Sequence, residues 1–154
     1  MLWPNFQYRP RSTHLKESKT DTQTPRLRLA LFDLDHTLLP LDSDYEWGEF
    51  TIRLGWNDPV EFARRNDEFY AHYQAGTLDV HDYVRFATEA VRLRGPEAAA
   101  AAHAQFMREV IAPAIRPQAL DLIRQHQAAG EQVLIVTATN EFVTRPIAKA
   151  LGVE

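Results

Sequence analysis

The chain has 154 residues, of which 45% are hydrophobic and 25% charged, and it contains no cysteine. This length leaves room for one ordinary domain, or one domain with a small insert, and the composition is typical of a folded protein. Without cysteine, disulfide bonds, thiolate metal sites and cysteine nucleophiles are excluded, and we expect a cytoplasmic protein rather than a secreted one. No apolar run is long enough to cross a bilayer, so we expect no membrane span.

The formal net charge of -4 is distributed unevenly along the chain. Residues 1–28 carry six basic and two acidic side chains, which leaves the remainder at about -8. An acidic body argues against binding to nucleic acid, because nucleic-acid phosphates attract basic surfaces. Prolines at positions 4, 10 and 25 interrupt the basic segment, and no helical apolar stripe runs through it. We therefore predict that residues 1–25 form a disordered leader.

The first predicted element is a buried parallel strand over residues 27–32 (LRLALF), which ends abruptly at Asp33. Apolar spacing then predicts four helices in succession. They cover about residues 44–55, 58–76, 79–95 and 96–111. The run from Asp42 to Asp44, the pair Asp58-Pro59 and Asp79 are each suited to the start of a helix.

Beyond Pro117 the pattern changes from helices alone to alternating helix and strand. Apolar residues between 119 and 126 predict a helix that ends at Gly130, and residues 132–136 form a strand rich in β-branched side chains. Residues 140–151 predict a last helix. The order of strand, helical insert, helix, strand and helix predicts an α/β fold whose two strands both end in polar residues.

Asp33 and Asp35 follow the first strand directly, in the run DLDHT. A carboxylate at the end of such a strand points into the crevice of the sheet, and a second one two residues later can reach the same cavity. Two negative charges are tolerated there if a cation lies between them or if one is protonated, and these oxygen ligands suit Mg²⁺. Asp33 can then attack phosphorus to form an aspartyl phosphate, while Asp35 protonates the leaving alkoxide and later activates water.

Two threonines offer hydroxyl groups to the same site. Thr37 can hold a phosphate oxygen or orient the nucleophile. Thr137 ends the second strand just before a helix, where its hydroxyl and the helix amides can bind a phosphate oxygen. Each signal also has a structural interpretation, because aspartate favours turns and caps and threonine is as often a plain N-cap. The apolar strand before Asp33 favours the catalytic interpretation.

The aromatic residues of the helical block are expected in its core rather than on a substrate-facing wall. They are Trp47, Trp56, Phe62, Phe69, Tyr70 and Tyr73. The histidines after the first strand have no shared spacing that would indicate a zinc site.

Residues 29–39 (LALFDLDHTLL) resemble the first motif of the haloacid dehalogenase superfamily, and Thr137 matches the second motif. The helical block between these motifs resembles the superfamily's C1-type cap. The resemblance implies a Rossmann-like parallel sheet, incomplete in this sequence, formed by residues 26–41 and 114–154. The inserted all-helical cap then covers residues 42–113.

Within this superfamily the chain resembles the phosphoserine-phosphatase-like branch, subfamily IB. The similar segments are SDYEWG at 43–48, TATN at 137–140 and PIA at 146–148. The likeness runs from about residue 27 to the end of the sequence.

The resemblance also implies roles for individual residues. Asp33 is then the nucleophile, and Asp35 is the acid/base, which also gives its main-chain carbonyl to Mg²⁺; the two aspartates are the expected metal ligands. Thr137 binds phosphate. Asp42 matches an acidic residue that reads the substrate, and Arg85 is the best match to a cap arginine with a similar role. A plain surface position is the alternative for both of these residues.

The superfamily's third motif, a lysine, and its fourth, an acidic cluster that completes the metal shell, have no counterpart before Glu154. Lys149 falls inside the last predicted helix and does not match. We therefore expect a C-terminally truncated chain whose 154 residues alone are a poor phosphatase, because charge stabilisation of the transition state is reduced.

The leading hypothesis is a magnesium-dependent phosphomonoester hydrolase that acts on a small phosphorylated metabolite such as phosphoserine or histidinol phosphate. A second hypothesis is chemistry on a phospholipid head group, which an associated membrane segment would favour. A third is an inactive truncated remnant or a helical module that binds a partner protein, which the unmatched motifs favour.

Overall fold

The computed structural model describes residues 27–153, so the predicted leader, residues 1–25, lies outside the described residues. The elements in chain order are β1 (Leu29–Phe32), the turn η1 (Leu34–Leu38), α1 (Ser43–Arg53), α2 (Pro59–Gln74), α3 (Val80–Ala87), α4 (Glu89–Arg94), α5 (Pro96–Phe106), the wide helical turn η2 (Met107–Ile111), α6 (Ala112–Ala114), α7 (Pro117–Ala128), β2 (Gln132–Ile135) and α8 (Glu141–Leu151). Within this range no helix has the length and apolar character that a membrane crossing requires.

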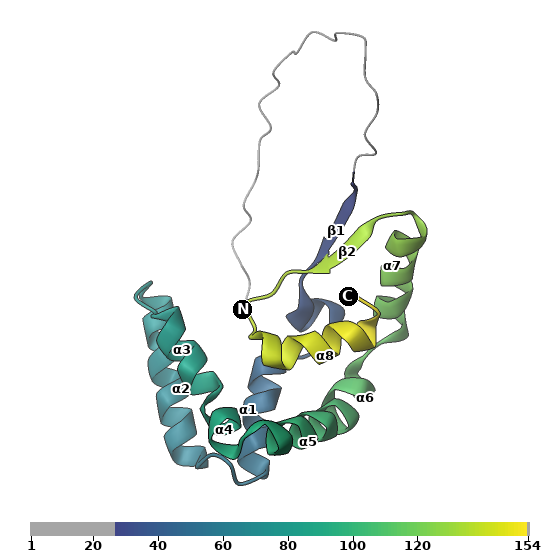
Figure 1. Cartoon of the computed structure of the whole chain (residues 1–154). Coiled ribbons are helices and arrows are strands. Elements are labelled where there is room, and N and C mark those ends of the chain that lie inside the picture. The colour runs from purple at the N-terminus through teal and green to yellow at the C-terminus, as the bar shows by residue number, and fades with distance from the viewer. Residues whose placement is uncertain (1–26, 154) are drawn as a thin grey trace.

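The two strands lie side by side and run parallel (Figure 1). Their register pairs Ala30 with Val133 and Phe32 with Ile135, and the amide of Val136 donates to the carbonyl of Phe32 at 2.8 Å. Parallel strands require a long crossover, which the helices between them provide. The α/β fold with a helical insert is therefore confirmed. Because both strands end at the same edge, the loops that follow them begin next to each other.

One hydrophobic cluster joins the sheet to the surrounding helices, and we call it the main core. Its buried members are Ala30, Leu34, Leu38, Leu39, Trp47, Phe50, Ala102, Phe106, Ile111, Ile123, Val133, Val143, Ile147, Leu151 and Val153. Since α1 and α5 contribute to the same cluster as the strands, they share the core of the sheet. The division of the chain at residues 42 and 113 stays a prediction.

Helix starts follow the capping residues that the sequence indicates. The side chains of Asp42, Asp58, Asp79 and Asn140 accept main-chain hydrogen bonds in the first turns of α1, α2, α3 and α8. Each such cap typically contributes about 1 kcal/mol to helix stability. The predicted starts of these four helices are confirmed, because capping depends on residues that are close in sequence.

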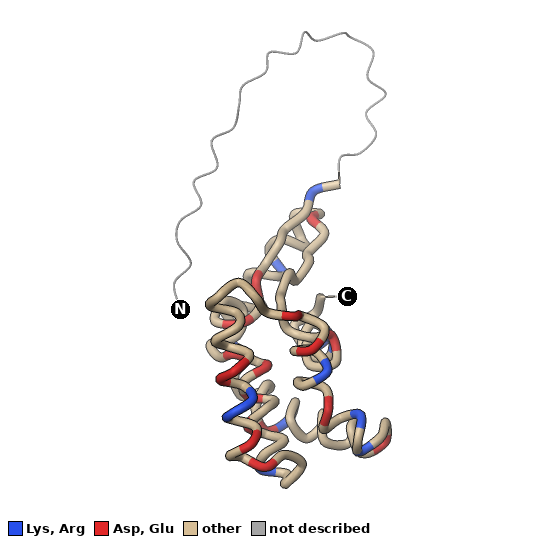
Figure 2. Tube along the Cα trace, turned by 90° about the vertical axis from the view of Figure 1, so that its left-hand side faces the viewer, with Lys and Arg blue, Asp and Glu red and all other residues tan. Residues whose placement is uncertain are grey.

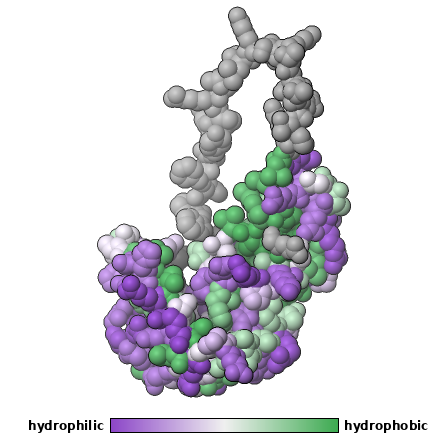
Figure 3. All heavy atoms as spheres, viewed as in Figure 1, coloured by the Kyte–Doolittle hydropathy of each residue, from purple (hydrophilic) through white to green (hydrophobic). Residues whose placement is uncertain are grey.

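The sheet is buried on one face only, and the prediction of a fully buried first strand is wrong. Ala30 is 7% exposed, whereas Leu29 and Leu31 are 50% and 60% exposed. Neighbouring side chains in a strand point to opposite faces, so both leucines lie on the same outer face. Figure 3 shows the resulting hydrophobic surface around β1. Among the described residues, helix side chains pack on the face that carries Ala30 and Val133.

The helix predicted over 79–95 is two helices, α3 and α4, which are separated at Thr88. The Thr88 hydroxyl donates to the carbonyl of Val84 at 2.7 Å. Threonine hydroxyls that bond back in this way bend helices. By contrast, the helix predicted over 96–111 extends through η2 to the end of α6.

The helical block has a second group of packed rings, formed by Phe62 and Phe69 of α2 with Tyr83 and Phe86 of α3. We call these four residues the ring cluster. The two phenylalanines of α2 are partly buried in this cluster and are not part of the main core, and the expected core role is wrong for the exposed Tyr70 and Tyr73 of the same helix. Trp47 packs instead in the main core.

The ring cluster meets α1 at a glycine. A Cβ atom added to Gly48 would lie 2.9 Å from the ring of Phe62, which is closer than real Cβ contacts come. The absence of a side chain at this position therefore permits the close packing of α2 on α1. Acidic and basic residues are interspersed along α2 (Figure 2), and Arg64 forms exposed ion pairs with Glu61 and Glu68.

His103 of α5 lies in the main core and is 6% exposed. Its ring centroid lies 5.6 Å from that of Trp47 and 5.1 Å from that of Phe142. Among the described residues its Nε2 atom has no hydrogen-bond partner. Burial lowers the pKa of His103, because a charged imidazolium would lose its hydration there.

We predict that the free energy of unfolding falls more steeply from pH 7 to pH 5 in the wild type than in His103→Gln. Unfolded His103 takes up a proton near pH 6.5, whereas the folded state takes it up only at lower pH. Stability is therefore lost as the pH falls through the unfolded pKa, by at most about 1.4 kcal/mol per pH unit. Urea unfolding at several pH values measures this, with exposed His81→Gln as the control. Equal pH slopes for wild type and His103→Gln would contradict the prediction.

Candidate active site

The turn after β1 is held in the core by its leucines. Leu34, Leu38 and Leu39 are buried, and the amide of Leu39 donates to the carbonyl of Leu34 at 2.9 Å. His36 between them has a φ of 56°, in the left-handed region that non-glycine residues rarely adopt. This conformation reverses the chain within the run DLDHT, and such backbone strain is common at functional sites.

Thr37 and Asp33 are joined by a hydrogen bond within this turn. The Thr37 hydroxyl donates to Oδ2 of Asp33 at 3.1 Å. This bond restrains rotation of the carboxylate and leaves its Oδ1 atom for other contacts. Asp33 follows β1 directly, so the carboxylate lies at the carboxyl edge of the sheet.

Asp35 is held by both loops that follow the strands. Its Oδ1 atom accepts a hydrogen bond from the amide of Ser43, at the start of α1, at 2.8 Å. Its Oδ2 atom accepts a hydrogen bond from the Thr139 hydroxyl, in the loop after β2, at 2.8 Å. Both carboxylate oxygens of Asp35 are therefore oriented by protein donors.

Thr137 contacts Asp35 only indirectly in this arrangement. Its hydroxyl accepts a hydrogen bond from the amide of Thr139 at 3.1 Å, and Thr139 in turn bonds Asp35. Sequence reasoning assigned Thr137 of the pattern TATN to the site and gave no role to Thr139, the threonine that bonds Asp35. The role of Thr137 in phosphate binding stays a prediction.

A second set of hydrogen bonds lies next to Asp35 and centres on Asp44. Its Oδ1 atom accepts from Nδ2 of Asn140 at 3.0 Å, and its Oδ2 atom accepts from the Tyr83 hydroxyl at 2.5 Å. Burial raises the pKa of Asp44, and the negative charges of Asp42 and Asp35 raise it further. Burial and the Asp44 carboxylate raise the pKa of Tyr83 as well.

Sequence reasoning did not assign these three residues to the site. Tyr83 fell on the apolar face of a predicted helix, and Asp44 was one of several acids at a helix start. Asn140 was noted as part of the TATN pattern and as the start of the last predicted helix. The one signal available was a tyrosine among apolar positions, since its hydroxyl requires a partner when buried.

Asp42 and Arg85 have structural roles in the described chain. Oδ1 of Asp42 accepts from the amides of Asp44 and Tyr45 as the cap of α1. Arg85 is exposed and pairs with Asp82 at 3.3 Å. It lies two residues from Tyr83, so its side chain leaves α3 on nearly the opposite face. Their substrate contacts stay predictions.

The oxygen donors at this edge suit a magnesium ion. Among the described residues there is no group of three or more His, Cys, Asp or Glu side chains that could hold a metal ion. Mg²⁺, however, is commonly held by one or two carboxylates together with water and substrate phosphate. Asp33 has a carboxylate at this edge, and the expected second donor is the main-chain carbonyl of Asp35, whose side-chain oxygens are engaged by Ser43 and Thr139. This donor set fits Mg²⁺.

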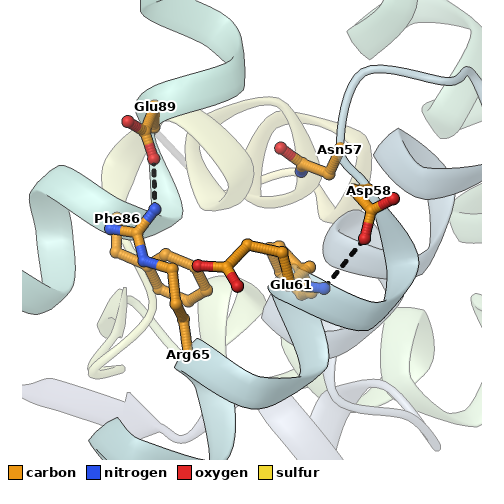
Figure 4. Close-up of a pocket in the computed structure, with 7 residues that line it drawn as sticks. Asn57, Asp58, Glu61, Arg65, Phe86 and Glu89 are labelled. Atoms are coloured by element: carbon orange, nitrogen blue, oxygen red, sulfur yellow. Dashed lines mark hydrogen bonds and ion pairs between the residues drawn. The ribbon is translucent and has the colours of Figure 1, made fainter.

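A small pocket in the helical block has a structural explanation. Its volume is ≈ 50 Å³, too small for a metabolite, and no candidate site residue lines it. Figure 4 shows Arg65 reaching from α2 across Phe86 to Glu89. The guanidinium lies 4.6 Å from the centroid of the Phe86 ring and bonds the Glu89 carboxylate at 2.6 Å. These contacts hold α2 against α3 and α4.

Comparisons with known proteins show which families and structures this chain is similar to. The model of a family described as haloacid dehalogenase-like hydrolase matches residues 30–154. The histidinol-phosphatase of Neisseria meningitidis serogroup C (strain 8013) is 38% identical over 125 residues, which is 81% of this chain and 56% of that protein. A probable phosphatase of Mycobacterium tuberculosis (strain ATCC 25618 / H37Rv) is 37% identical over 46 residues, which is 30% of this chain and 16% of that protein.

A solved structure is also similar. It is a protein of unknown function from Bordetella pertussis Tohama I, with a TM-score of 0.74 and 50% identity. The match covers 83% of this chain and 58% of that one. The chain thus spans little more than half the length of the Neisseria and Bordetella proteins, at 56% and 58%.

We predict that Asn140→Asp lowers the free energy of unfolding by about 1–3 kcal/mol at pH 7, because it removes a donor from the partly buried Asp44 carboxylate and adds a second negative charge. Aspartate and asparagine are equally good N-caps, so a residue that only caps α8 would tolerate the change. Urea unfolding measures the difference. Asp58→Asn, at the cap of α2, is the matched control and should differ from wild type by less than about 0.5 kcal/mol. An equally small effect at Asn140 would argue against the Asp44 contact.

Proposed function

This chain belongs to the haloacid dehalogenase-like hydrolase family, and we propose that the whole protein to which it belongs is a magnesium-dependent phosphatase of small phosphomonoesters. The observation that carries the proposal is the pair Asp33 and Asp35 at the end of β1, with the second carboxylate oriented by donors from both strand ends. The similarity to a histidinol-phosphatase supports the same reaction class.

Asp33 is the proposed nucleophile. Its Oδ1 atom attacks the substrate phosphorus, and the bond between phosphorus and the leaving alkoxide breaks, which gives an aspartyl phosphate. The hydrogen bond from Thr37 to Oδ2 supports this assignment, because it limits rotation of the carboxylate before the attack. A nucleophile held in one orientation loses less entropy when it reacts.

Asp35 is the proposed acid and base. Ser43 can only donate through its amide, so Oδ1 of Asp35 must remain an acceptor. The Thr139 hydroxyl can donate or accept, so Oδ2 is the atom that can carry a proton. In the first step this proton passes to the leaving alkoxide. In the second step Oδ2 takes a proton from the water that attacks phosphorus, inorganic phosphate leaves, and Asp33 is restored.

Two further groups assist in the proposed reaction. Asp33 and the main-chain carbonyl of Asp35 would hold Mg²⁺, which supplies positive charge that offsets the repulsion between the nucleophile and the phosphate. The Thr137 hydroxyl and the amides at the start of α8 would bind phosphate oxygens, as helix N-termini commonly do.

Histidinol phosphate is the proposed substrate, ahead of phosphoserine. The printed name of the Neisseria relative supports this choice, because that protein matches most of the described chain. The proposed contact for the substrate's cationic part is Asp42, whose negative charge lies close enough to Asp44 to affect its pKa.

In the whole protein we predict that Asp33→Asn lowers kcat with Mg²⁺ by on the order of a thousandfold or more, because the amide is not a nucleophile. The measurement is hydrolysis of p-nitrophenyl phosphate and of histidinol phosphate. Chelation of Mg²⁺ should abolish wild-type turnover, and added Mg²⁺ should restore it. Asp121→Asn, on the exposed face of α7, is the control and should keep wild-type rates. Undiminished turnover by Asp33→Asn would show that Asp33 is not the nucleophile.

We also predict that Asp42→Asn raises KM for histidinol phosphate about tenfold through loss of a charge contact, while kcat changes little. Asparagine preserves the cap of α1, so the fold should be unaffected. KM for p-nitrophenyl phosphate, which lacks a cationic group, should be unchanged. A similar rise in KM for both substrates would exclude a charge-reading role for Asp42.

A further inference from the structure

Three residues outside the proposed chemistry form a connected set of hydrogen bonds beside Asp35. Asn140 and Tyr83 each donate to a different oxygen of Asp44, at 3.0 and 2.5 Å. The three residues belong to α1, α3 and the start of α8 (Figure 1), so the set joins segments that are far apart in the sequence. We call these residues the Asp44 network.

The Asp44 network is adjacent in sequence to both donors that hold Asp35. Ser43, which precedes Asp44, donates to Oδ1 of Asp35, and Thr139, which precedes Asn140, donates to Oδ2. The bond between Asp44 and Asn140 therefore links the two segments that orient the carboxylate. Movement of either segment would change the position of a donor to Asp35.

The orientation of the Asn140 amide is determined by the helix that it caps. Its Oδ1 atom accepts from the amide of Val143 at 3.3 Å, so Nδ2 must face Asp44. A reversed amide would lose the cap bond and would direct an oxygen toward the carboxylate. The bond between Asn140 and Asp44 can therefore form with only one orientation of the Asn140 amide.

Tyr83 connects this network to the helical insert. Its ring packs in the ring cluster, 5.5 Å from Phe69, while its hydroxyl bonds Asp44. The position of α3 relative to α1 therefore decides whether Asp44 receives its second donor. If the insert moved α3 relative to α1, the hydrogen bond from Tyr83 to Asp44 would change. The neighbouring Ser43 and its hydrogen bond to Asp35 would then change as well.

We propose that Asp44, Asn140 and Tyr83 are positioning residues, which orient Asp35 through Ser43 and Thr139 and make this orientation depend on the placement of α3. The inference rests on the proposed function, because it concerns the proton that Asp35 delivers. None of the three residues is required to touch the substrate.

Tyr83→Phe tests the inference in the whole protein, since it removes the hydroxyl and keeps the ring. A leaving alkoxide needs the proton from Asp35, whereas p-nitrophenolate leaves readily without it. We expect kcat/KM for histidinol phosphate to fall about tenfold, and that for p-nitrophenyl phosphate to stay within about twofold. Tyr73→Phe, an exposed tyrosine of α2, is the matched control. Equal losses on both substrates would indicate a purely structural role and would overturn the proposal.

The second test combines Tyr83→Phe with Asp44→Asn. If Tyr83 acts only through Asp44, the double variant should lose no more activity on histidinol phosphate than Asp44→Asn alone. Additive losses would mean that Tyr83 acts by another route, which contradicts the proposal.

A third measurement does not depend on activity. Amide hydrogen exchange at Ser43 should be faster in Tyr83→Phe by about fivefold or more, because the amide bond to Asp35 opens more often. Exchange at Val60 and Glu61, which Asp58 caps, should be unchanged. If the wild type hydrolyses neither substrate, the proposed function is wrong. The exchange rate at Ser43 still shows whether Tyr83 holds the Ser43 amide on Asp35. If the wild type is active but Tyr83→Phe changes neither the substrate ratio nor the exchange, the positioning role fails alone.

Discussion

The parallel pairing of β1 with β2 is the interaction on which the candidate site depends. The bond from the Val136 amide to the Phe32 carbonyl places the two strand ends side by side. As a result Asp35 and Thr139, which are 104 residues apart in sequence, can form a hydrogen bond of 2.8 Å. Neither loop could hold the carboxylate alone, because each supplies a donor to only one of its oxygens.

The start of α1 offsets the negative charge that the site concentrates. Asp35, Asp42 and Asp44 lie close enough together for the first two to raise the pKa of the third. The amide of Ser43 bonds Asp35, and the amides of Asp44 and Tyr45 bond Asp42. The first amides of a helix have no partner within the helix, and here three of them donate to two carboxylates. The helix dipole also favours negative charge at this end. The same residues that begin the helix make the acidic cluster tolerable.

Features that depend on neighbours in sequence could be predicted, and features that depend on distant contacts could not. The caps at Asp58 and Asp79 and the α/β order belong to the first kind, as does the family, which the run from Leu29 to Leu39 indicated. The second kind includes the hydroxyl contact of Thr139 and the one-sided burial of β1. A nearly continuous apolar run is typical of a strand covered on both faces, so the sequence carried no signal that Leu29 and Leu31 are exposed.

Helix α1 connects the insert to the site because two of its faces have different partners. Asp44 and Gly48 are four residues apart and so lie on one face, where they meet Tyr83 and Phe62 of the ring cluster. Another face carries Trp47 and Phe50 into the main core. Exchange of one hydrogen bond for water costs about 1 kcal/mol net, whereas moving Trp47 out of the core would expose a large apolar surface. A shift of the insert at the Asp44 contact therefore affects the start of α1, where Ser43 bonds Asp35, while Trp47 and Phe50 keep the rest of the helix in the core.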